Sequence, residues 1–235
     1  MLPKIQHPLF DETIPSTGQK IKFRPMTVKE EKILLMAKQS GERVDMLNSI
    51  IQVVGNCIEA EKIDVNKLSL CDVEYLFTKI RSQSVSNIVK VTYIDSEDNE
   101  SRTFDVDLNA VVATPGPKTN KIDLGGETYM TLKLPPITLY TQKDFLDASD
   151  TQVFEMLMLN SMDRIYEGDR VHVCAESTSE EIKEFTESLS SKTYTQIQTF
   201  FSQIPHLEYV IKYTNNQKHE RVIVLKGLED FFVFG

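Results

Sequence analysis

The sequence predicts an α+β fold, in which helices and strands occupy separate blocks of the chain. Between residues 26 and 84, apolar side chains recur at spacings of three and four, which is typical of amphipathic helices. At Ile88 the period changes to two, which predicts antiparallel hairpins. Helical patterns then return and precede a last hairpin. We therefore expect an N-terminal helical block, central antiparallel hairpins, and C-terminal helices followed by a β-hairpin.

Four regions follow one another along the chain. Residues 1–25 contain prolines that disfavour helix, and this predicts an extended N-terminal arm. Residues 26–86 form a helical region, residues 87–140 a β-rich region, and residues 141–235 a mixed helical and hairpin region. The strongest break in the chain is the sequence PGPKTN at residues 115–120. A chain of 235 residues can form one compact domain or two.

Capping residues locate the helices of the helical region. Thr27 with Glu30, and Ser69 with Asp72, fit the reciprocal arrangement that satisfies amide groups at a helix start. Gly41 is suited to end the first helix, because glycine adopts the left-handed conformation common after a last turn. The sequence thus predicts three helices, over about residues 27–40, 43–60 and 71–84.

The later elements alternate between hairpins and short helices. Thr141 with Asp144, Thr178 with Glu181, and Thr193 with Gln196 predict three helix starts, and the apolar segment 153–159 predicts a well-buried helix. Turn residues separate four pairs of predicted strands, which are residues 88–94 and 102–108, residues 121–124 and 129–134, the segment 162–174 around a turn at 167–169, and residues 207–213 and 221–225.

Composition and charge exclude several classes of protein. The formal net charge of −9 argues against an extended nucleic-acid footprint, which needs clustered lysine and arginine. No apolar run approaches the roughly 20 residues that span a bilayer, and the first residues do not form a signal peptide. Three cysteines without a CxxC spacing indicate a reducing compartment rather than a disulfide framework. We expect a cytoplasmic protein with no nucleic-acid or membrane partner.

Motifs for chemistry are missing from the sequence. It contains no phosphate-binding loop, no HExxH and no GxSxG. His172 and Cys174 are the one local pair that could begin a zinc site or a Cys–His nucleophilic site, and a partly buried strand face is the alternative. Cys57 and Cys71 lie on or beside apolar helix stripes, where cysteine behaves as a small core residue. We expect no catalytic residues, no cofactor and no bound metal.

The C-terminal aromatic residues are the first candidates for partner binding. Phe231, Phe232 and Phe234 lie within five residues of the end of the chain. Chain ends are usually frayed unless they dock, so these rings either pack on the protein's own core or insert into another chain. Arg24 is the second candidate, because it belongs to a basic cluster that could receive an acidic surface or form a solvated face beside Glu30.

Five segments, in order along the chain, carry a resemblance to a known family. They are Ile14–Gly18, Phe23–Leu35, Cys71–Val85, Phe200–Leu207 and Leu225–Phe232. On these segments the chain resembles the baseplate hub assembly proteins of T-even-like tailed bacteriophages. The family pattern contains no catalytic residues to carry over to this sequence.

The resemblance implies a non-enzymatic protein of phage tail morphogenesis. Such a protein would act in baseplate hub assembly by chaperone-like protein–protein binding, with other hub proteins and the tape-measure protein as partners. It would work in the host cell cytoplasm during assembly. The first alternative is a structural subunit retained in the tail baseplate of the virion, and the second is an enzyme that uses Cys174 and His172.

Overall fold

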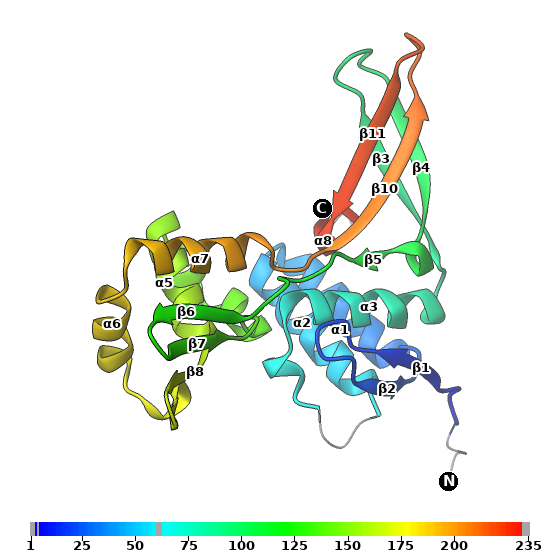
Figure 1. Ribbon diagram of the computed structural model, residues 1–235. Coiled ribbons are helices and arrows are strands. Elements are labelled where there is room, and N and C mark those ends of the chain that lie inside the picture. Colours follow the sequence, from blue (N-terminus) through cyan, green and yellow to red (C-terminus); the bar gives the residue numbers. More distant parts are fainter. Residues whose placement is uncertain (1–2, 4, 60–62, 232–235) are drawn as a thin grey trace. The chain divides into compact units, whose positions relative to one another are not determined.

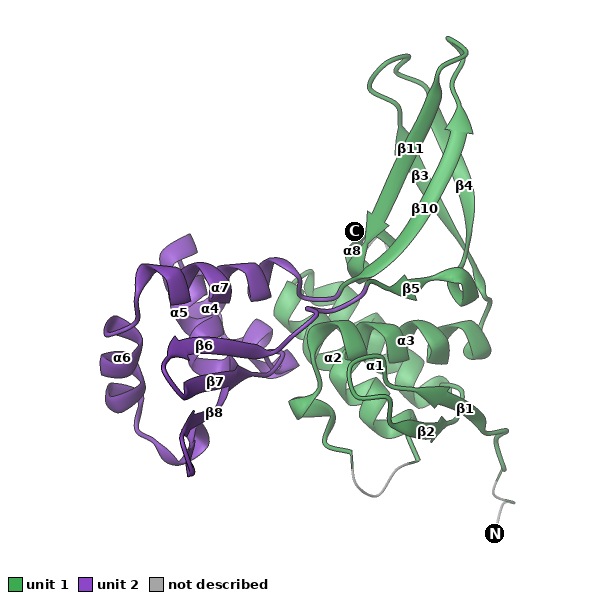
Figure 2. Cartoon of the chain, in the orientation of Figure 1, with its two compact units in different colours: residues 1–114, 206–235 green, residues 115–205 purple. Residues whose placement is uncertain are grey.

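The computed structural model describes residues 3, 5–59 and 63–231 and confirms the α+β class (Figure 1). The chain folds into two compact units (Figure 2). Unit 1 comprises residues 1–114 and 206–235, and unit 2 comprises residues 115–205. Unit 2 thus begins at the break predicted at residues 115–120. The predicted regions 87–140 and 141–235 each contribute to both units.

Three helices form the base of unit 1. They are α1 (Val28–Ser40), α2 (Arg43–Cys57) and α3 (Leu70–Ser84), with a 3-10 turn η1 (Val65–Lys67) before α3. The predicted capping boxes at Thr27 and Ser69 are confirmed, and Gly41 ends α1 with a φ of 71°. The prediction that α2 reaches residue 60 is wrong. Ile58 leaves the helix because it forms a β-bridge with Phe23.

Residues 10–23, within the region predicted as an extended arm, form a hairpin. Strands β1 (Phe10–Thr13) and β2 (Lys20–Phe23) pair antiparallel, and Phe10 lies opposite Phe23. Ile14, Ile21 and Phe23 are buried in unit 1. The apolar side chains of the hairpin pack it on the helices.

Two long hairpins, which we call the stalk, rise side by side from these helices (Figure 1). One consists of β3 (Ile88–Ile94) and β4 (Ser101–Asp107), and the other of β10 (Leu207–Thr214) and β11 (Glu220–Lys226). The short strand β5 (Val112–Ala113), which follows the 3-10 turn η2 (Leu108–Ala110), extends the second hairpin into a sheet of order β11-β10-β5. Val91, Val106, Ile211 and Leu225 are buried in the stalk.

Unit 2 is built on a four-stranded antiparallel sheet of order β6-β7-β8-β9. Its strands are β6 (Lys121–Gly125), β7 (Thr128–Leu132), β8 (Met162–Glu167) and β9 (Arg170–Val173). Its helical elements are η3 (Ile137–Thr141), α4 (Lys143–Leu146), α5 (Asp150–Ser161), η4 (Cys174–Glu176), α6 (Ser179–Glu187) and α7 (Ser191–Ser202). Met130, Met158, Ile197 and Phe200 belong to its core.

Two of the predicted helix starts in unit 2 are wrong. Thr141 does not cap α4, because its hydroxyl donates to the Thr138 carbonyl 3.0 Å away. Helix α7 begins one turn earlier than predicted, since the Ser190 hydroxyl accepts the Thr193 amide at 3.1 Å. The third start, at Thr178, is confirmed.

Helix α5 differs from its prediction in burial. Only Met158 and Ser161 are buried along this helix, and Leu159 is 39% exposed. The apolar residues of α5 run around the helix, but a unit of this size has too little interior to cover more than one side.

Candidate functional site

Two of the segments that carry the family resemblance, Ile14–Gly18 and Cys71–Val85, meet in unit 1. Asp72, which is 1% exposed, accepts hydrogen bonds from the amide of Ser16 at 2.9 Å and from its hydroxyl at 2.6 Å. The same carboxylate accepts the Ser69 hydroxyl at 2.6 Å. It therefore caps α3 and ties the turn between β1 and β2 to the start of that helix. These residues serve the fold rather than a chemical site.

Arg24, a predicted partner-binding residue, lies in an internal ion pair. Its guanidinium donates to Glu30 at 3.1 Å and to the Asn56 carbonyl at 3.0 Å. Burial raises the pKa of Glu30, but the hydrogen bonds from Arg24 and Thr27 outweigh it and lower this pKa to about 2. The pair joins the start of α1 to the end of α2. A role for Arg24 in partner binding stays a prediction.

The C-terminal helix α8 (Gly227–Phe231) carries the first of the three candidate aromatic residues. Phe231 is 2% exposed and so is Leu228. The amide of Leu228 donates to the Glu74 carboxyl of α3 at 3.3 Å. Phe231 is thus packed on the protein's own core. Phe232 and Phe234 lie outside the described residues, and their partner-binding role stays a prediction.

The contact between Glu74 and α8 predicts a pH dependence of stability. Burial raises the pKa of Glu74 from its ordinary 4.5 to about 7. Between these two values the folded protein holds a proton that the unfolded chain has lost, so the free energy of unfolding falls as pH rises. Glu74→Gln stays neutral and keeps an acceptor for the Leu228 amide. We expect its melting temperature to exceed that of the wild type by several degrees at about pH 8 and by much less at about pH 5.

Differential scanning fluorimetry of both proteins across this pH range measures the effect. An advantage of the variant that stays constant with pH would contradict the assignment of the effect to Glu74.

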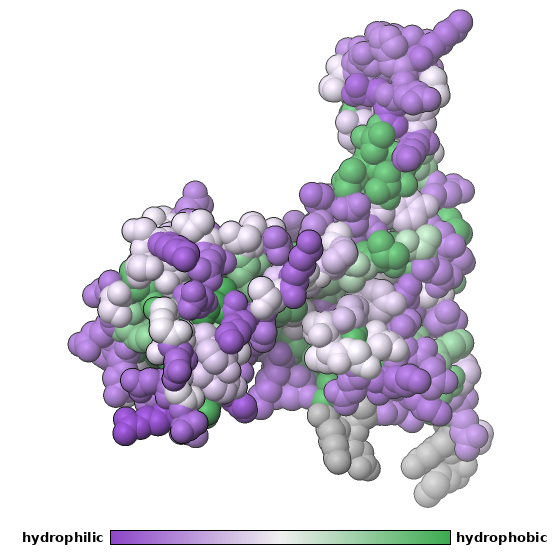
Figure 3. Space-filling view, in the orientation of Figure 1, coloured by the Kyte–Doolittle hydropathy of each residue, from purple (hydrophilic) through white to green (hydrophobic). Residues whose placement is uncertain are grey.

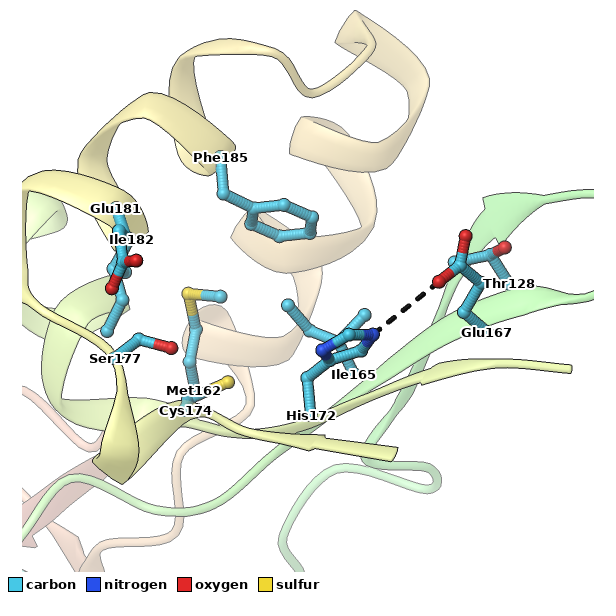
Figure 4. A pocket seen from close by; sticks show the side chains of 10 residues that line it. All are labelled: Thr128, Met162, Ile165, Glu167, His172, Cys174, Ser177, Glu181, Ile182 and Phe185. Carbon is cyan, nitrogen blue, oxygen red and sulfur yellow. Dashed lines mark ion pairs between the residues drawn. The ribbon is translucent and has the colours of Figure 1, made fainter. Parts of the chain in front are cut away.

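A pocket of about 380 Å³ lies between α6 and the sheet of unit 2 (Figure 4). Met162, Ile165, Ile182 and Phe185 give it an apolar lining. Polar side chains of α6, of the strands and of the segment between them complete the lining, namely Thr128, Glu167, His172, Ser177 and Glu181. Such an apolar hollow with a polar rim suits a large apolar side chain from another molecule.

His172 and Cys174, the one local pair predicted for chemistry, both line this pocket. The His172 ring is directed to Glu167, 3.5 Å from its carboxylate, and Cys174 is buried (Figure 4). Burial raises the pKa of the Cys174 thiol, whereas a cysteine nucleophile needs a lowered pKa. Within the described ranges, no three His, Cys, Asp or Glu side chains gather as they would around a metal ion.

The other two cysteines lie in unit 1. Cys57 and Cys71 are buried, which confirms their prediction as core residues, and burial raises their thiol pKa values to about 11 and 12.

The stalk was predicted only as separate hairpins, and its polar tip was missed. Asp95 is fully buried and accepts the Tyr213 hydroxyl at 2.6 Å and the Arg221 guanidinium at 3.2 Å. The hydrogen bond from Tyr213 lowers the pKa of Asp95. Glu97 lies 2.8 Å from the His219 ring. The acidic turn 95–100 thus binds the turn of the second hairpin. Asp95 and Tyr213 are 118 residues apart in the sequence, so no local sequence motif could indicate this contact.

Both outer faces of the stalk carry exposed apolar side chains. On β3–β4 the face carries Ile88 and Ile94, which are 41% and 64% exposed, and Lys90, which is paired to Asp105 at 2.8 Å. On β10–β11 the face carries Val210, Val222 and Val224, which are 42%, 60% and 41% exposed. We call these three residues the valine face, and Figure 3 shows hydrophobic surface over this hairpin below its hydrophilic tip. Large contiguous patches of exposed apolar surface often mark contacts with other proteins, and the valine face is a candidate for such a contact.

Helix length and hydropathy bear on membrane contact. None of the helices in residues 3, 5–59 and 63–231 combines the length and apolar character that crossing a bilayer requires.

Comparison with known proteins places the chain in a family. No curated protein and no solved structure gives a significant match. A family model described as T4 bacteriophage base plate protein matches residues 7–233, nearly the whole chain. The match confirms the phage baseplate part of the predicted resemblance and suggests a structural or assembly protein rather than an enzyme. The chain belongs to the T4 bacteriophage base plate protein family and has a role in the phage baseplate.

Proposed function

We propose that this protein assists assembly of the baseplate hub in the host cytoplasm by binding other hub proteins and the tape-measure protein in a chaperone-like manner. The observation that supports the proposal most is the pocket of unit 2. Its apolar lining is open to a partner side chain, and the raised pKa of the Cys174 thiol opposes its use as a nucleophile. Binding that buries an apolar anchor in such a pocket contributes most of the energy of many protein complexes.

Co-purification of hub and tape-measure proteins from infected cells tests this proposal. Ile182→Lys places a charge at the half-buried wall of the pocket, and we expect it to reduce recovery of the partner at least tenfold, since burying an unpaired charge opposes binding. Glu184→Lys is the matched control, because it adds the same side chain at an exposed position of α6. Equal recovery with both variants, or no hub protein with the wild type, would contradict the proposal.

Mass spectrometry of purified virions separates the proposal from its alternative. A chaperone-like factor is missing from the particle or present below the copy number of the hub subunits. A stoichiometric amount would favour a structural subunit retained in the baseplate, a function that the family description equally suits.

A further inference from the structure

Strand β11 is a sheet edge whose middle is open. It is the outer strand of the sheet β11-β10-β5, and it pairs with β10 without a bulge from Glu220 to Lys226. Its sequence, ERVIVLK, contains no proline. Native proteins usually protect such an edge with a bulge, a proline, an inward charge or a covering segment. On β11 the inward-facing Arg221 does so near the tip, and Asp230 occupies the Lys226 amide at the other end. Residues 222–224, between these two points, are therefore free to pair with another strand.

The backbone of β11 has free groups on this edge. Next to the hairpin turn, His219 faces Asn215, the residue after β10, and accepts its amide at 3.0 Å, so the backbone groups of His219 point toward β10. The Lys226 amide turns away from β10 and donates to Asp230 at 2.7 Å. Along an antiparallel strand, the backbone groups of successive residues point alternately toward the partner strand and away from it. Val222 and Val224 lie an even number of residues from Lys226, so their N–H and C=O groups also point away from β10. Among the residues that the structure describes, no hydrogen bond to those groups occurs.

We propose that β11 pairs with β11 of a second copy of this chain, antiparallel, around a two-fold axis at Ile223. In this register Val222 lies opposite Val224 of the second copy, so that the free backbone groups bond to each other. Glu220 lies opposite Lys226 of the second copy. Because of the two-fold symmetry, Lys226 also lies opposite Glu220 of the second copy, so two ion pairs form. Both residues are exposed in the single chain. Opposite charges at facing positions stabilise a strand pair.

Charge and backbone direction select this register. A shift of two residues one way places Val222 opposite Lys226, and a shift the other way places Glu220 opposite Val224, so both ion pairs are lost. After a shift of one residue, backbone groups that point away from β10 in one copy face groups that point toward β10 in the other copy, so the hydrogen bonds between the two strands cannot form. The selected register also joins two valine faces into one apolar surface on a six-stranded sheet. This pairing is independent of the proposed hub function.

Sedimentation velocity of the full chain at about 1 and 100 µM tests the pairing, and we expect a dimer at the higher concentration. Val222→Pro removes an edge amide without loss of a bond to β10, so we expect it to stay monomeric. Val210→Pro is the matched control, since its amide also points away from β11, and we expect it to dimerise. A monomeric wild type, or the same result with both variants, would overturn the proposal.

A cysteine pair tests the register directly and does not require the proline variants to fold. Ile223→Cys places a thiol at the two-fold axis, and we expect mild oxidation to link most chains into disulfide dimers. Ile211→Cys is the control, because Ile211 faces Ile223 on β10, and is 8% exposed where Ile223 is 9%. The native cysteines are buried. Equal linkage of both variants, or none with Ile223→Cys, would overturn the register.

Discussion

Phe231→Ala is expected to lower the free energy of unfolding of unit 1 by about 3–5 kcal/mol, the usual cost of removing a buried phenylalanine side chain. The ring is 2% exposed, and helix α8, which carries it, has five residues and is too short to be stable without tertiary contacts. Its loss leaves a cavity beside α8. Urea unfolding followed by far-UV circular dichroism measures the change.

Glu229→Ala is the control for this substitution. Glu229 lies in the same helix, but its side chain is 61% exposed and its ion pair with Arg43 spans 2.8 Å at the surface. Such pairs contribute at most about 1 kcal/mol. If Phe231→Ala instead keeps wild-type stability and loses partner binding, Phe231 acts in another chain, which is the other alternative that the sequence left open.

Asp72→Ala is expected to cost about 2–4 kcal/mol, because one carboxylate performs two tasks. It caps α3 through Ser69, and it accepts both polar hydrogens of Ser16 in the turn of the N-terminal hairpin. The substitution uncaps the helix and leaves these donors without their acceptor. We expect faster amide hydrogen exchange in β1 and β2 and in the first turn of α3, measured by mass spectrometry, besides the loss in urea.

Asp45→Ala serves as the matched control. Asp45 also lies in a helix first turn, in α2, but it is exposed, so we expect only the weak effect of its interaction with the helix dipole, about 0.3–1 kcal/mol. Exchange that accelerates in α3 but not in the hairpin would show that the bonds between Asp72 and Ser16 do not hold the hairpin.

Local patterns predicted most elements of this fold. The capping boxes at Thr27, Ser69 and Thr178 require only residues three positions apart, and the structure has all three. Helix α8 was missed because five residues, GLEDF, are too few to show a helical period. The sequence predicted that more of α5 is buried than the structure shows. Apolar composition does not indicate how much of a helix the rest of a small unit can cover.

The candidate surfaces could be predicted only in part. The pocket draws residues from β7, β8, β9 and α6, and its one sequence signal was the pair His172 and Cys174. The valine face was hidden because β11 is apolar on both sides, so a period of two did not separate its outer residues Val222 and Val224 from the inner residue Ile223. Which hairpin pairs with which depends on contacts distant in sequence, such as Asp95 with Tyr213.

The position of unit 2 within the sequence has a consequence for the order of events on the ribosome. Strand β5 needs β10 as its partner, and the amide of Thr114 bonds to the His206 carbonyl at 2.8 Å, yet all of residues 115–205 are synthesised between them. Unit 2 is complete in sequence before unit 1 has its last strands. During translation unit 2 can therefore fold first. Unit 1 can complete its fold only after residues 206–235 have been synthesised.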